Sequence, residues 1–119
     1  MIKIGCLLNV KDNTGINKIK FIGTFKKRKK SMRIGDILIG SVKKTSNILF
    51  KKSEIVLAIL IKTKQPHLRK DGTTIKFFDN GVIIIDKNFI PKGTHIFGPV
   101  PFEIKLKYKK IASLSNNFV

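Results

Sequence analysis

Apolar residues in this chain come in short runs separated by turn-forming residues. They almost never recur at the three-and-four spacing of an amphipathic helix. Runs of this kind are typical of β-strands joined by tight turns. The turn signals combine Asp, Asn, Pro and Gly, which suit the backbone conformations of hairpin turns. The pattern predicts strands near Lys3–Val10, Ile16–Thr24, Gly35–Val42, Glu54–Thr63, Thr74–Phe78, Val82–Asp86 and Thr94–Phe97.

Two runs, Ile55–Ile61 and Val82–Ile85, are apolar at every position, so both faces of the corresponding strands need cover. A single small sheet cannot cover both faces. A closed or nearly closed barrel buries one face in its interior, and a loop, a short helix or a partner protein covers the other. We therefore predict a mainly β protein built on a small barrel.

Two further segments have distinctive patterns. Residues 62–78 are predicted to form a β-ribbon with its turn at Pro66–Gly72, and the basic tip carries Leu68, which suggests docking. An ordinary solvated hairpin is the alternative interpretation. The tail, 102–111, alternates like a strand at some positions and has helical spacing at others, so the pattern alone does not decide its structure.

Length and charge narrow the class of protein. The 119 residues fit one domain, 1–119, because a chain of this length forms a single core. Lys and Arg number 25 against seven Asp and Glu, which gives a net charge of +18. This excess repels itself unless an anionic partner neutralises it. The longest apolar run is far shorter than the ~20 residues of a membrane-spanning helix. We expect no membrane partner, because no long basic amphipathic helix is visible either.

The basic residues gather at loops and strand ends, which predicts an extended anionic partner such as nucleic acid. Lysine outnumbers arginine 22 to 3, so few side chains are suited to bidentate base contacts. We therefore expect recognition of the backbone and shape of a folded RNA. The candidate RNA contacts are Lys26, Lys27, Arg28, Lys29, Lys30, Arg33, Lys43, Lys44, Lys51, Lys52, Lys62, Lys64, Arg69, Lys70, Lys107, Lys109 and Lys110.

Catalytic chemistry has little support in the sequence. The acidic residues are scattered, mostly in turns, and no pair has a motif-like spacing. Cys6, His67 and His95 form no nucleophile motif, and one cysteine with two histidines makes neither an internal disulfide nor a structural zinc cluster. No phosphate-binding glycine motif is present. We predict a protein that is not an enzyme and holds no metal and no cofactor.

A long spaced pattern runs through the middle of the chain: the apolar quartet Ala58-Ile59-Leu60-Ile61, nine residues, Asp71-Gly72, four residues, Phe77, two residues, Asn80, two residues and Ile83-Ile84. Further matching segments are Asp12-Asn13-Thr14-Gly15, Gly35-Asp36 and Gly93-Thr94-His95-Ile96-Phe97-Gly98-Pro99-Val100. Together they resemble the universal ribosomal protein L-fourteen family of the large subunit, over essentially the whole length. The resemblance implies a five-stranded barrel with a protruding basic ribbon and short C-terminal helices.

The resemblance also implies a function. Family members are structural constituents that bind large-subunit rRNA, contact neighbouring ribosomal proteins and help form a bridge to small-subunit rRNA. A ribosome-silencing factor docks on a surface that this chain matches in part, so Thr94, His95 and Phe97 are candidate protein contacts. His95 stands where the family usually has Arg, which leaves that partnership open.

The sequence leaves alternatives open for the cellular compartment and for the function. Twenty Ile, two Ala and the excess of Lys over Arg are a bias toward AT-rich codons, which favours a mitochondrial ribosome over a plastid or an AT-rich bacterial cytoplasm. The alternative function is a free-standing small barrel that binds single-stranded RNA by stacking. That function needs aromatic side chains exposed in a basic groove, for which Phe25 and Phe78 are the candidates.

Replacing the five cations at 26–30 by Gln tests the predicted phosphate role of that loop. Each lost phosphate contact should lower the slope of log K against log salt by about 0.7–0.9. The measurement is RNA affinity over a range of salt concentrations, and an unchanged slope would contradict the assignment.

Overall fold

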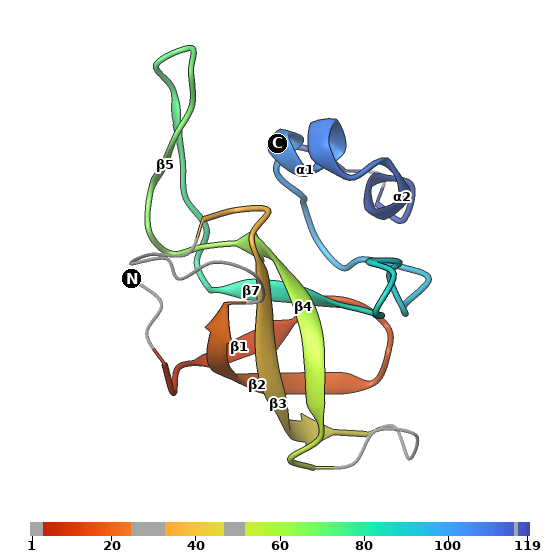
Figure 1. Cartoon of the computed structure of the whole chain (residues 1–119). Helices are drawn as coiled ribbons and strands as arrows, with labels where there is room; N and C mark the ends of the chain where they lie inside the picture. Colours follow the sequence, from red (N-terminus) through yellow and green to blue (C-terminus); the bar gives the residue numbers. More distant parts are fainter. Residues whose placement is uncertain (1–3, 25–32, 47–51, 116) are drawn as a thin grey trace.

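A closed five-stranded barrel forms the centre of the fold in the computed structural model, which describes residues 4–24, 33–46, 52–115 and 117–119 (Figure 1). Adjacent strands pair antiparallel, except that the first and last strands close the barrel in parallel. This confirms the mainly β class and the barrel. Its strands, in order around the barrel, are β1 (Leu7–Val10), β2 (Ile16–Thr24), β3 (Ile37–Thr45), β4 (Ile55–Lys62) and β7 (Gly81–Ile85).

The barrel interior is filled by one face of every strand. On β4 and β7, Ala58 lies opposite Ile84 and Leu60 opposite Val82, and all four side chains are fully buried. On β3, Gly40 allows a close approach to β2, because a Cβ there would lie 2.7 Å from Cδ1 of Ile19. Burying each large aliphatic side chain contributes roughly 1.5–3 kcal/mol, so this core is a main source of stability.

A second apolar cluster covers the outer face of β4 and β7. Ile59 and Ile83 lie opposite each other there, fully buried, and pack with Ile104 and Ile111 of the C-terminal helices. These helices are α1 (Phe102–Lys107) and α2 (Lys109–Ala112), and they lie over one side of the barrel (Figure 1). The two uninterrupted apolar runs of the sequence are therefore explained by two cores, and the helical tail is confirmed.

The ribbon projects from the barrel between β4 and β7 (Figure 1). Its paired strands are short, β5 (His67–Leu68) and β6 (Thr74–Ile75), and the turn between them is tighter than the predicted Pro66–Gly72. Asp71 Oδ1 accepts hydrogen bonds from both the amide and the hydroxyl of Thr73, which fixes the turn. Leu68 of β5 is 73% exposed.

The predicted strand Thr94–Phe97 is wrong. Its residues belong to no ladder, and Ile96 makes only an isolated antiparallel bridge to Asp12. The reason is that two consecutive amides of the segment donate to different parts of the chain. Ile96 N donates to Leu114 O at 3.2 Å, and Phe97 N donates to Lys11 O at 2.7 Å. The segment is an ordered loop held between the barrel and the tail.

Asp12 joins the turn after β1 to β7, a strand that is distant in sequence but pairs with β1 in the barrel. Asp12 is only 5% exposed. Its Oδ1 accepts hydrogen bonds from the Thr14 hydroxyl at 2.6 Å and from the Thr14 amide at 3.2 Å. Oδ2 accepts the Ile84 amide at 2.9 Å, across 72 positions of sequence. Both carboxylate oxygens are therefore needed as acceptors.

Replacing Asp12 with Asn should lower the free energy of unfolding by about 1–3 kcal/mol, because the new amide group presents a donor to a buried donor. Urea denaturation followed by circular dichroism measures the change. Asp71→Asn is the matched control, since its side chain is exposed and should cost little. Equal stability of Asp12→Asn and the parent chain would contradict this role.

Candidate nucleic-acid interface

The acidic side chains are mostly turned toward the protein itself. Asp36 accepts the Arg33 amide at 2.7 Å, and Asp86 Oδ1 accepts the amides of Asn88 and Ile90 at 2.9 and 3.0 Å. Asp12 and Asp71 serve their own turns in the same way. These four carboxylates therefore fix loops of the protein itself.

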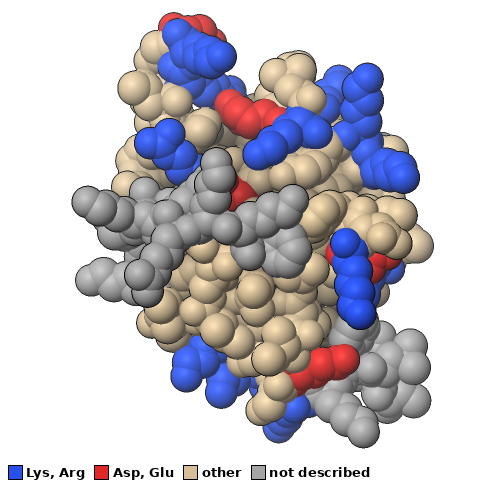
Figure 2. Space-filling model, viewed as in Figure 1, with Lys and Arg blue, Asp and Glu red and all other residues tan. Residues whose placement is uncertain are grey.

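The cations lie on the surface. Of the 18 Lys and Arg among the described residues, 15 are exposed, and Figure 2 shows them at the ribbon tip, over the helices and at the opposite end of the barrel. In this view they lie at both ends of the molecule. The candidates among them are Arg33, Lys43, Lys44, Lys52, Lys64, Lys70, Lys107, Lys109 and Lys110.

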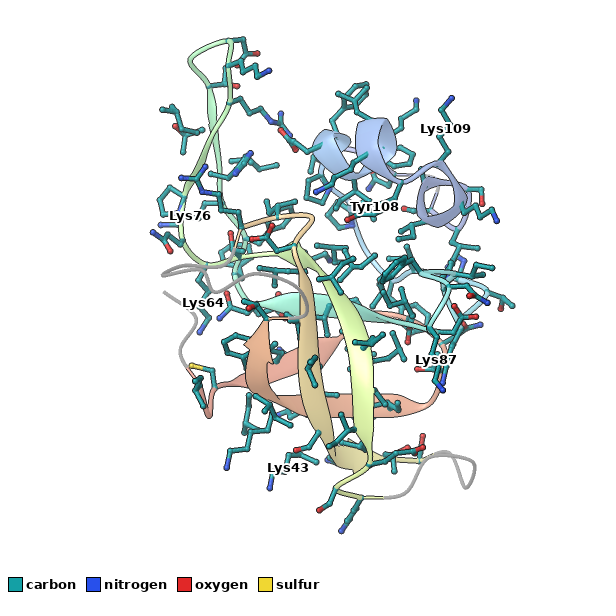
Figure 3. All side chains as sticks on the ribbon, in the orientation of Figure 1. Lys43, Lys64, Lys76, Lys87, Tyr108 and Lys109 are labelled. Atoms are coloured by element: carbon teal, nitrogen blue, oxygen red, sulfur yellow. The ribbon has the colours of Figure 1, made fainter. Side chains whose placement is uncertain are left out.

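These exposed candidates come from distant parts of the chain. Lys43 lies at one end of the barrel, Lys64 at the foot of the ribbon and Lys109 on α2 (Figure 3). An open pocket of about 350 Å³ is lined by Arg33 and Ile34 on one part of the chain and by residues 63 and 65–68 of the ribbon on another. An anion that contacts all of them must extend around the molecule. The candidates Lys26, Lys27, Arg28, Lys29, Lys30 and Lys51, and the aromatic Phe25, lie outside the described residues.

Lys62 differs from the expectation of an exposed phosphate contact. The residue is 6% exposed, and its Nζ donates to Phe97 O at 3.4 Å and lies 5.9 Å from the centre of the Phe77 ring. Burial lowers the pKa of Lys62, and the charge of Lys11 acts in the same direction. Lys62 therefore connects the end of β4 to the Phe97 loop inside the protein.

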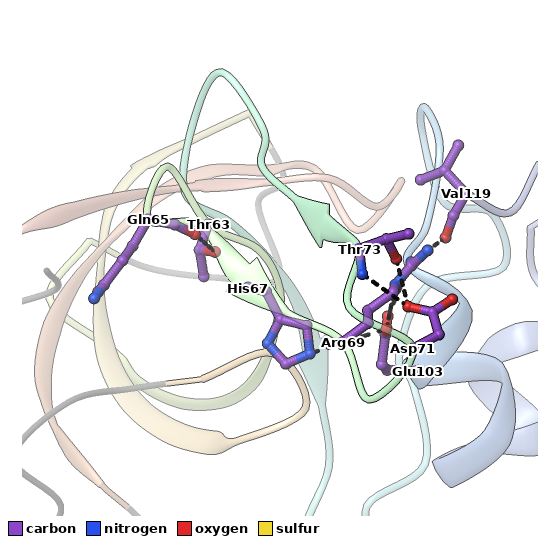
Figure 4. A network of polar contacts seen from close by, with 8 residues as sticks. All are labelled: Thr63, Gln65, His67, Arg69, Asp71, Thr73, Glu103 and Val119. Carbon is purple, nitrogen blue, oxygen red and sulfur yellow. Dashed lines mark hydrogen bonds and ion pairs between the residues drawn. The ribbon is translucent and has the colours of Figure 1, made fainter.

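Arg69 is likewise held by internal contacts (Figure 4). Its Nε donates to Glu103 Oε1 at 2.6 Å, and its Nη2 donates to Glu103 Oε2 at 3.3 Å and to the Val119 main-chain oxygen at 2.6 Å. His67 Nε2 lies 3.9 Å from the same carboxylate. The guanidinium thus ties the ribbon to α1 and to the last residue of the chain.

Lys107 has an intermediate position. Its Nζ lies within 3.5 Å of Gly35 O, which also accepts a 2.8 Å hydrogen bond from the Tyr108 hydroxyl. The residue is nevertheless exposed, so its ammonium faces both the barrel and solvent.

The candidate protein contacts Thr94, His95 and Phe97 are all exposed on one loop. Asn13 holds the loop: its Oδ1 accepts the amides of Thr94 and His95 at 2.7 and 3.2 Å, and its Nδ2 donates to the Thr94 hydroxyl at 2.7 Å. The rings of His95 and Phe97 meet edge to face, 5.6 Å apart. The turn 12–15 therefore presents a small, ordered aromatic surface.

Sequence reasoning missed several exposed lysines that lie within strands or stand singly in loops. Lys18 and Lys20 are on β2, and Lys76 follows β6. Their signal is positional: polar side chains at alternate positions of an apolar strand indicate its solvent face. Phe78 was a candidate for exposure, and it is 102% exposed.

A metal site and a membrane-spanning helix each require a particular arrangement of residues. Within the described ranges, no three His, Cys, Asp or Glu side chains gather as a metal site requires. No helix in the described chain has the length and apolar character needed to cross a membrane.

A fold of this kind with a cationic surface fits the resemblance found in the sequence. The sequence model described as ribosomal protein L14p/L23e matches residues 1–119. The chain belongs to this family. It is 41% identical over 120 residues to the large ribosomal subunit protein uL14 of Petrotoga mobilis, and the match covers 97% of each chain. L14p/L23e is a family of ribosomal proteins, not of enzymes, and the predicted family is confirmed.

In this L14p/L23e protein, the Arg69 contact should be visible in the titration of Glu103. Burial acts to raise the pKa of that carboxyl, but hydrogen bonds from Arg69 and the charges of Arg69 and His67 hold it below its ordinary value. The stabilisation from the pair is therefore present above the ordinary glutamate pKa and is lost as the pH falls through the lowered one.

Carboxyl-carbon NMR should give a lower titration midpoint for Glu103 in the parent chain than in Arg69→Ala. The amide of residue 69, which donates to Thr73 O at 2.8 Å, should also exchange faster in the variant, because the ribbon loses its tie to α1. Lys70→Ala is the matched control on the same turn, and an equal midpoint in all three proteins would contradict the contact.

Proposed function

We propose that this L14p/L23e protein is a structural constituent of the large ribosomal subunit that binds large-subunit rRNA through its exposed lysines. The observation that carries the proposal is the separation of charge: four of the seven carboxylates bind amides of the protein's own turns, whereas 15 described cations are exposed on a protein of a ribosomal family. Such a surface is neutralised by a polyanion that surrounds the protein on several sides.

The binding mechanism is charge neutralisation with fit to a folded RNA. Lysine ammonium groups act as point charges on phosphates, and each contact releases counterions, which makes affinity fall with salt. We assign phosphate contacts to the nine exposed candidates named above, to the 26–30 loop and to Lys51. Lys62 and Arg69 are left out of this surface, because Lys62 Nζ and the Nε and Nη2 atoms of Arg69 have partners in the protein.

We assign the protein contacts to the loop that carries Thr94, His95 and Phe97, because an ordered, exposed aromatic surface suits a protein partner. A neighbouring ribosomal protein or a ribosome-silencing factor is the proposed occupant. Contact with small-subunit rRNA at an inter-subunit bridge belongs to the same proposal, with the exposed lysines as its basis. The whole chain, 1–119, acts as one domain and without catalysis.

The compartment stays a prediction. The reported relative is a bacterial protein, which gives the mitochondrial assignment no support beyond the AT-rich codon bias. A plastid ribosome and a bacterial cytoplasmic ribosome are the alternatives.

Sedimentation of the tagged full chain from its own cells tests the proposal. We expect it to co-sediment with the large subunit and to remain there at moderate salt. A protein that stays at the top of the gradient and binds short RNA oligomers would instead support the free-standing single-stranded RNA binder.

Neutralising exposed lysines should weaken rRNA binding in a way that depends on salt. Lys43→Gln with Lys44→Gln should lower the slope of log K against log salt by about 0.7–0.9 for each phosphate contact removed. Filter binding to full-length large-subunit rRNA measures the slope. Lys11→Gln is the matched control, because Lys11 is engaged 2.6 Å from Asp79 and should leave the slope unchanged.

A further inference from the structure

Phe78 is the most exposed of the large hydrophobic side chains that the structure describes, at 102%. Its backbone is nevertheless anchored on both sides. Before it, the Phe77 amide donates to Thr63 O at 2.9 Å, and after it, Asn80 O accepts the Asn9 amide at 3.0 Å. A bare aromatic ring on a fixed backbone is costly for the free protein, and a ligand binding to it loses little conformational entropy.

The side of the ribbon on which Phe78 stands is basic. Burial alternates from Thr74 to Phe78: Ile75 and Phe77 are partly buried, whereas Lys76 and Phe78 are exposed. Lys64 lies beside them through its hydrogen bond to Asn80. Lys64 and Lys76 lie on the same side at the foot of the ribbon in Figure 3.

The one carboxylate next to Phe78 in sequence does not oppose this charge. Asp79 Oδ2 lies 2.6 Å from Lys11 Nζ and accepts a 3.0 Å hydrogen bond from Asn9 Nδ2. Exposed Phe78 thus lies two residues after the exposed Lys76, and two residues before Asn80, which is hydrogen-bonded to the amide of the exposed Lys64. An aromatic face flanked by cations is complementary to a nucleotide, whose base stacks on the ring while its phosphates meet the ammonium groups.

We propose that Phe78, Lys64 and Lys76 form a stacking site for one unpaired base of large-subunit rRNA. This inference rests on the proposed function and adds a contact of a different kind. The base is held by its flat face, so the site tolerates any base, and its contribution to affinity does not depend on salt. The two lysines contribute the salt-dependent part.

The test compares Phe78→Ala, Phe78→Leu and Phe78→Trp in the full chain with the parent protein. Affinity for full-length large-subunit rRNA from the same source is measured across a range of salt concentrations, and circular dichroism checks the fold. Phe78→Ala should bind about 5- to 150-fold more weakly, the loss expected for one stacked base, with an unchanged salt slope. Phe78→Trp should bind at least as well as the parent.

Phe78→Leu is the decisive variant, because leucine keeps the apolar bulk and removes the flat π face. It should lose nearly as much affinity as Phe78→Ala. Lys64→Gln with Lys76→Gln should instead lower the salt slope by about 0.7–0.9 per contact.

Parent-like binding by Phe78→Ala would overturn the stacking site and leave the proposed function intact. Full affinity in Phe78→Leu would also overturn it, and would point to a simple apolar contact. If the parent chain itself had no affinity for the rRNA, the proposed function would fail with it.

Discussion

Strands β4 and β7 are buried on both faces, and the rest of the chain is arranged to provide that cover. The closed barrel encloses Ala58 and Ile84, while the loop at 94–98 and the two C-terminal helices cover Ile59 and Ile83. A small barrel alone leaves the second face in water. The tail is therefore part of the folded core, and its lysines are carried to the surface on elements whose inner sides are fixed by packing.

That arrangement explains how so cationic a chain folds. Four of the carboxylates accept hydrogen bonds from backbone amides, as Asp12 does between the 12–15 turn and β7. The cations need no such position, because a lysine stem can lie along the surface while its ammonium remains in water. Lys62 and Arg69 differ from most of them, because they connect separate elements through contacts within the protein.

Local pattern predicted what local physics determines. β2 was predicted with its observed bounds, Ile16–Thr24, because its alternation follows a turn that Gly15 closes at a φ of 91°. Apolar and polar residues alternate in the segment 94–97 too. Whether such a segment pairs depends on a free strand edge elsewhere in the fold, which the local sequence does not specify. The buried state of Lys62 depends on the Phe97 carbonyl, 35 positions away, and the internal use of Arg69 depends on Glu103, 34 positions away. The tail was ambiguous in periodicity, and only the family resemblance indicated helices.

Closure of the barrel affects how protein molecules that are not bound to a partner interact with one another. The parallel pairing of β1 with β7 joins the first strand to the last, so the barrel strands present no open ladder to a neighbouring molecule. The paired part of the ribbon is only two residues long on each side, which is too short to template strand addition. A chain that is 42% hydrophobic is thereby protected from edge-to-edge aggregation, and the repulsion of its +18 charge acts in the same sense.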